Sequence, residues 1–119
     1  MMPKLAITVN GSAPSNVFPA FIIGSSAVAS GDDLVLFFTP AGSLALLKGE
    51  LEKMSKVKGL PDLVELYDGV VSLGGKIYLC GLALEAKDLK KEDFRESVEI
   101  IGATTFLNEI KNATVTFSF

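Results

Sequence analysis

The stretch Gly74-Gly75-Lys76-Ile77-Tyr78-Leu79-Cys80-Gly81 decides how the rest of the chain is organised. Its three central residues, Ile77 to Leu79, form an apolar, β-favouring run, and the two glycines before it supply a turn that ends a preceding helix. The stretch therefore predicts a buried strand whose last residue is Cys80. In a parallel α/β sheet, the carboxyl end of a strand borders the crevice in which ligands bind.

Cys80 is the only cysteine of the chain. A helix that begins after its strand would direct backbone N–H groups at the sulfur and favour the thiolate, which is the nucleophilic form. Cysteine is also among the most buried residue types and often packs as a small hydrophobe. A reactive thiol and an inert core residue are therefore both compatible with this position.

Composition excludes several classes of function. The chain has 119 residues and fits one domain, residues 1–119. Its net charge of −3 argues against nucleic-acid binding, and the absence of histidine excludes a histidine base or a histidine-ligated metal site. Any nucleophile must therefore be activated by other means. The expectation of no metal and no cofactor belongs to the mechanism implied by the family resemblance described below.

The hydropathy pattern predicts a protein without a membrane span. The apolar run 5–9 is too short for a signal-peptide core, and glycine, proline and serine interrupt the longer runs 17–29 and 34–47. A cytoplasmic location is the expectation. Hydrophobic residues nevertheless make up 49% of the chain and charged residues only 21%. So few charges leave apolar surface to cover, which favours a homo-oligomer.

The amino-terminal half alternates strands with helices. Strands are expected at 4–9 and 34–38, with the second at the centre of the sheet because it is continuously apolar. A helix is predicted from 17 to 29, and a short one around 44–47. Residues 50–58 read as a solvated helical extension or a mobile connector, and a further helix runs from 61 to 73.

The carboxyl-terminal half continues this alternation. Residues 85–99 hold ten charged side chains and read as a solvated helix face. A short strand at 98–101, a helix at 102–112 and an edge strand at 114–119 complete the chain. The whole pattern predicts an α/β fold, a three-layer α/β/α sandwich around a mostly parallel five-stranded sheet.

Turns that follow the first three strands should meet at one edge of this sheet. They place a polar crevice beside Cys80, formed by residues that are small or hydrogen-bonding: Asn10, Gly11, Ser12, Thr39, Gly42, Ser43 and Gly81. One alternative function is therefore a non-catalytic oligomeric binding or scaffold protein. Such a protein could hold a small anion in the loop 10–16, at the start of the first helix.

Several stretches carry a family resemblance when they are taken in order. They are Phe21-Ile22-Ile23 with 27–31, then 35–39, Cys80, 90–93 and 98–107. Together they resemble the DsrE/DsrF-like family, particularly its small peroxiredoxin-like members. The resemblance implies a DsrE/F-like sandwich assembled as a trimer or hexamer. It also implies a sulfur-relay role in which Cys80 carries sulfane sulfur as a persulfide between donor and acceptor proteins.

Overall fold

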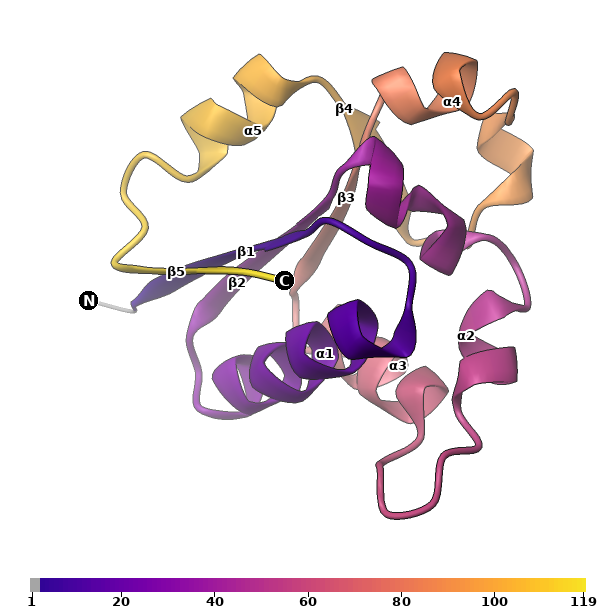
Figure 1. Cartoon of the computed structure of the whole chain (residues 1–119). Coiled ribbons are helices and arrows are strands. Elements are labelled where there is room, and N and C mark those ends of the chain that lie inside the picture. Colours follow the sequence, from indigo (N-terminus) through magenta and orange to yellow (C-terminus); the bar gives the residue numbers. More distant parts are fainter. Residues whose placement is uncertain (1–2) are drawn as a thin grey trace.

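A five-stranded parallel sheet forms the centre of the structure, a computed structural model that describes residues 3–119 (Figure 1). The spatial order of the strands is β4-β3-β2-β1-β5, and each neighbouring pair is parallel. Their bounds are β1 Lys4–Val9, β2 Asp33–Phe38, β3 Lys76–Cys80, β4 Val98–Ile101 and β5 Val115–Ser118. The predicted sheet is confirmed, with β2 at its centre and β5 at an edge, and it is wholly rather than mostly parallel.

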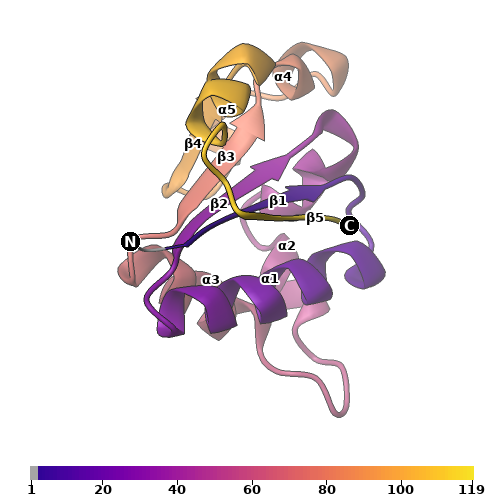
Figure 2. The same ribbon diagram turned by 90° about the vertical axis from the view of Figure 1, so that its left-hand side faces the viewer.

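Helices connect the strands and lie on both faces of the sheet (Figures 1 and 2). The α-helices are α1 Pro14–Ala29, α2 Glu50–Met54, α3 Leu63–Ser72, α4 Leu82–Ala86 and α5 Ala103–Glu109, and the 3₁₀ helices are η1 Pro40–Leu46 and η2 Lys91–Asp93. Within the described residues, no helix has the length and apolar character needed to cross a membrane.

The larger core lies between the sheet and the helices α1 and α3. Alternate residues of β2, such as Leu36 and Phe38, point to this face and are fully buried. Phe21 of α1 contacts both Phe38 and Tyr67 of α3, with ring centroids 6.0 and 5.7 Å apart. Gly74 follows α3 with φ of +92°, a conformation that glycine adopts without strain, and leads the chain into β3.

The opposite face of the sheet has a thinner cover. Its apolar cluster contains Val35, Phe37, Tyr78 and Cys80, and α5 closes it with Phe106. The Phe37 and Phe106 rings stack at a centroid distance of 4.2 Å. Figure 2 shows α5 on the side of the sheet opposite to α1 and α3. One short helix therefore covers the face to which Cys80 belongs.

Two local predictions were wrong, and a third held only in part. The expected crossing at 39–43 and the helix after it are one 3₁₀ helix, η1, which begins at Pro40. Residues 50–58 are not a solvated extension throughout, because Leu51 of α2 is fully buried. The charged stretch 85–99 is mostly turns, with only the end of α4 and the single turn η2 helical. High charge without an apolar period gives such a stretch no helical face to bury.

Candidate functional site

Cys80 is the last residue of β3, as the sequence predicted, but it does not face an open crevice. Only 5% of the residue is exposed, and it belongs to the apolar cluster beneath α5. In register it lies opposite Ile101 of β4, and the Gly81 N–H donates a 2.9 Å hydrogen bond to the Ile101 carbonyl. Gly81 therefore extends the backbone hydrogen bonding to β4 and does not expose the sulfur to solvent.

The surroundings of Cys80 differ from the expected helix N-terminus. The helix that follows it, α4, has five residues, too few for a strong helix dipole. Burial raises the pKa of Tyr78, which shares this face of the sheet, and the carboxylates of Glu109 and Glu99 raise it further. The region around Tyr78 is therefore apolar and close to two carboxylates, without a cation among these causes.

The loops after β1 and β2 do come together, as the sequence predicted. The Ser12 hydroxyl donates to the Ala41 carbonyl at 2.9 Å, and the Thr39 hydroxyl donates to the Val9 carbonyl at 3.2 Å. Gly42 is buried so close to β1 that a Cβ atom there would lie 2.4 Å from the Val9 oxygen. These residues bind the two loops to each other.

The polar side chains of the other predicted crevice residues also form hydrogen bonds within the protein. The Asn10 amide donates to the Ser118 hydroxyl at 2.7 Å, and the fully buried Ser43 hydroxyl donates to the Pro40 carbonyl at 2.7 Å. Gly11 faces the Asn16 side chain, which a Cβ atom would approach to 2.5 Å. The loop residues therefore hydrogen-bond to one another, and η1 also contacts β3 and α4, so the chain after β3 lies at the same edge as predicted. Cys80 itself points into the apolar cluster beneath α5.

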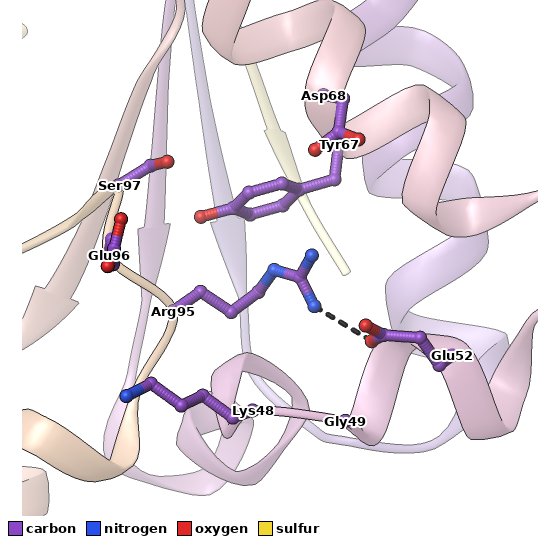
Figure 3. Close-up of a pocket in the computed structure, with 8 residues that line it drawn as sticks. All are labelled: Lys48, Gly49, Glu52, Tyr67, Asp68, Arg95, Glu96 and Ser97. Atoms are coloured by element: carbon purple, nitrogen blue, oxygen red, sulfur yellow. Dashed lines mark hydrogen bonds and ion pairs between the residues drawn. The ribbon is translucent and has the colours of Figure 1, made fainter.

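A pocket that was not predicted from the sequence lies between α2, α3 and the turn before β4, with a volume of about 360 Å³ (Figure 3). It is lined by Lys48, Gly49, Glu52, Tyr67, Asp68, Arg95, Glu96 and Ser97. The Arg95 guanidinium lies 4.6 Å from the centre of the Tyr67 ring and binds the Glu52 carboxylate at 2.8 Å.

Two signals in the sequence point toward this pocket. Arg95 is the only arginine of the chain, against ten lysines, and arginine is the cation that stacks on rings and pairs with planar acids. Tyr67 lies on the apolar face of its helix, where a hydroxyl needs a polar partner. Their meeting could not be foreseen, because it depends on how α3 packs beside the turn before β4.

Known proteins resemble the chain in sequence and in fold. It is 31% identical over 108 residues to an uncharacterized protein of Methanocaldococcus jannaschii, covering 91% of this chain and 38% of that protein. It is 24% identical over 96 residues to an uncharacterized protein of Methanopyrus kandleri, covering 81% of this chain and 75% of the relative. The chain thus spans well under half the length of the first relative.

Two solved structures share the fold across nearly the whole chain. The YchN protein of E. coli superposes with a TM-score of 0.80 at 18% identity and covers 99% of this chain and 100% of its own. A protein of unknown function from Methanobacterium thermoautotrophicum gives a TM-score of 0.75 at 11% identity, covering 97% and 98%. At these identities the likeness concerns the fold alone.

The sequence match to a family is nearly complete. The DsrE/DsrF-like family model matches residues 4–119, from the first residue of β1 to the end of the chain. The resemblance carried by the stretches around Phe21, Phe37, Cys80 and Val98 is therefore confirmed. This chain belongs to the DsrE/DsrF-like family.

Proposed function

We propose that this protein is a sulfur-relay protein that carries sulfane sulfur on Cys80. The observation that carries the proposal is the position of its only thiol, at the carboxyl end of β3 in a DsrE/DsrF-like fold. The helix α4 begins two residues after Cys80 and α5 covers its cluster, so both helices lie next to the sulfur. Donor and acceptor thiols would approach at this edge.

The proposed reaction is two successive thiol exchanges without a metal or cofactor. The Cys80 thiolate attacks the outer sulfur of a donor persulfide, so a new S–S bond forms and the donor leaves as a thiolate. An acceptor thiolate then attacks the outer sulfur of the Cys80 persulfide, and Cys80 leaves as a thiolate. Each step exchanges one S–S bond for another, and no external oxidant or reductant is consumed.

Access to Cys80 requires a local opening in the isolated chain. Phe106 is the buried residue of α5, and Ile110 packs partly buried beside it. A seven-residue helix held by so few apolar contacts belongs to the least stable part of a fold, where local openings occur most readily. Movement of α5 would bring the sulfur within reach of a donor persulfide.

The burial of Cys80 favours a second candidate, a non-catalytic binding or scaffold protein of the same fold. In that case Cys80 would act only as a small apolar side chain in the cluster with Phe37 and Tyr78. Replacement of Cys80 by serine or alanine separates the two functions. A scaffold protein keeps its cellular function with either residue, whereas a sulfur carrier loses it with both.

We also propose that the protein is a homo-oligomer, a trimer or hexamer, that works as a single domain in the cytoplasm. Leu82 of α4 and Leu107 of α5 are 71% and 57% exposed, so both helices beside Cys80 present apolar side chains. Contact with a second copy would cover such side chains. A cytoplasmic location would keep the thiol reduced.

The direct test of sulfur carriage is mass spectrometry of the native protein after incubation with a small persulfide. We expect one added sulfur atom on Cys80, removal of that sulfur by a reducing agent, and no addition to the Cys80→Ser variant. Alkylation of the unfolded wild-type protein serves as the control that the thiol was reduced at the start. A native protein whose thiol is reduced but never gains sulfur would contradict the proposal.

A further inference from the structure

The geometry points to a second binding site in the pocket of Tyr67 and Arg95, for a small carboxylate that also bears an ammonium group, as an amino acid does. This pocket is distinct from the Cys80 site. Arg95 to Ser97 precede β4 and so lie at its amino end, whereas Cys80 lies at the carboxyl end of the neighbouring β3. The two sites therefore occupy opposite edges of a parallel sheet.

The first argument is the Tyr67 hydroxyl. Only 2% of Tyr67 is exposed, and its buried oxygen has no hydrogen-bond partner among the residues that the structure describes. Figure 3 shows the hydroxyl directed toward Ser97 and Glu96, across the pocket. A buried hydroxyl without a partner costs free energy, and native proteins usually satisfy such groups. A polar ligand atom would supply the missing hydrogen bond once the side chains that cover this oxygen move aside.

The pKa of Tyr67 agrees with this environment. Burial raises the pKa of Tyr67, and hydrogen-bonding contact with the Ser97 hydroxyl and the positive charge of Arg95 partly oppose the increase. Neither group is at the distance and angle of a formed hydrogen bond to the hydroxyl oxygen. Tyr67 is therefore neutral at physiological pH and keeps its proton available for donation. The hydroxyl can therefore donate a hydrogen bond to an acceptor oxygen of a ligand.

The second argument is the orientation of Arg95. Its guanidinium is fixed on one side by the Tyr67 ring and at one nitrogen by Glu52, and its side chain is only 15% exposed. No other hydrogen bond of this guanidinium occurs within residues 3–119, so further N–H groups remain for a ligand. Arginine held in this way pairs with a carboxylate through two parallel hydrogen bonds. Arg95 and Tyr67 thus form the carboxylate-binding side of the pocket.

The third argument is the charge around the pocket. Its lining includes two cationic side chains, Lys48 and Arg95, and three acidic ones, Glu52, Asp68 and Glu96. Glu52 is paired with Arg95, but no ion pair engages Asp68 or Glu96 in the described part of the chain. A dianion would be repelled by these carboxylates, whereas an ammonium group would be attracted. A volume near 360 Å³ also suits a small ligand.

The test is a titration of the isotopically labelled full chain, followed by NMR. The probes are L-alanine, acetate and succinate, each added up to several tens of millimolar at constant ionic strength. We expect saturable shifts of the amides of Gly49, Asp68 and Ser97, with L-alanine binding more tightly than acetate and succinate binding most weakly. Equal or tighter binding of succinate, or no saturable shift with L-alanine, would overturn the proposal.

Two variants assign the contacts. Tyr67→Phe removes the hydroxyl and keeps the ring, and Arg95→Lys keeps the charge and removes the planar donor pair. Each should weaken L-alanine binding by about tenfold, the effect of losing a hydrogen bond to a charged group. The matched control is Tyr78→Phe, which removes the other tyrosine hydroxyl of the chain. Equal affinities in the wild-type protein and all three variants would refute the assignment.

Stability without ligand gives an independent readout. Because the Tyr67 hydroxyl has no partner in the described structure, Tyr67→Phe should unfold at the same or a slightly higher denaturant concentration than the wild-type protein. A clear loss of stability would mean that the hydroxyl is already bonded inside the protein and is not reserved for a ligand. That outcome would also overturn the proposal.

Discussion

Cys80 combines two properties that usually exclude each other, a strand-end position suited to chemistry and a place inside an apolar cluster. The first property could be predicted, because the glycines on both sides of the strand mark where it starts and ends. The second could not, because the cover comes from Phe106, more than twenty residues further along the chain. Local sequence carries no information on whether that helix returns to this face.

Removal of the cover should make Cys80 more reactive. We predict that Phe106→Ala raises the rate of Cys80 alkylation in the native protein several-fold, because Phe106 is the buried residue that holds α5 on the sheet. Thr104→Ala is the matched control, since Thr104 lies on the same helix and is exposed. Equal alkylation rates in both variants would show that α5 does not control access.

The tyrosine beside Cys80 should make the fold sensitive to alkali. The pKa of Tyr78 is raised in the folded state above its ordinary value of 10.0, so the unfolded chain loses the proton first as pH rises. The corresponding stabilisation is complete below pH 10.0 and is lost as pH increases through the folded-state pKa. Urea unfolding should therefore show a smaller alkaline loss of stability for Tyr78→Phe than for the wild-type protein. An identical loss would show that Tyr78 does not contribute.

The strands and the longer helices could be predicted from apolar patterns, whereas the short elements could not. The run from Leu34 to Phe38 is continuously apolar and is the central strand, as buried parallel strands are. η1 was misjudged because its geometry follows from the approach of Gly42 to β1, which is a tertiary contact. Lys91 to Asp93 form one 3₁₀ turn, which is too short for an apolar periodicity in the sequence to predict.

Alanine substitutions at two glycines distinguish the effect of tight packing from that of intrinsic helix propensity. Gly42→Ala should destabilise the protein by about 1–3 kcal/mol, because the added Cβ would lie 2.4 Å from the Val9 carbonyl oxygen and the backbone would have to shift. Gly69→Ala should stabilise it by about 0.5–1 kcal/mol, because Gly69 lies inside α3 with open space around it. Denaturant unfolding measures both. Similar effects of the two substitutions would contradict the described packing of η1 on β1.

In the molecule as a whole, helices cover the two faces of the sheet unequally. α1 and α3 bury one face of the sheet over most of its length, whereas α5 alone covers the cluster on the other face (Figure 2). β5 at the edge is exposed throughout, including Val115 and Phe117. The apolar composition indicated that surface had to be covered, but it did not indicate where.

This unequal cover predicts self-association. Light scattering at micromolar concentration should give a mass of several times 12.6 kDa. Leu107→Lys should reduce that mass if the α5 face takes part, whereas Thr104→Lys adds the same charge to the same helix without removing an apolar side chain. A monomer in the wild-type protein would contradict the assembly, and a mass unaffected by Leu107→Lys would place the interface elsewhere.

The central claim is that Cys80 receives sulfur and passes it on, and a transfer experiment tests it most directly. Protein loaded with labelled sulfur on Cys80 is separated from the donor and mixed with a small acceptor thiol, and the label is followed by mass spectrometry. We predict that the label leaves Cys80, appears on the acceptor as a persulfide, and leaves the protein thiol able to be loaded again. A label that stays on the protein, or a Cys80→Ser protein that transfers sulfur equally well, would contradict the claim.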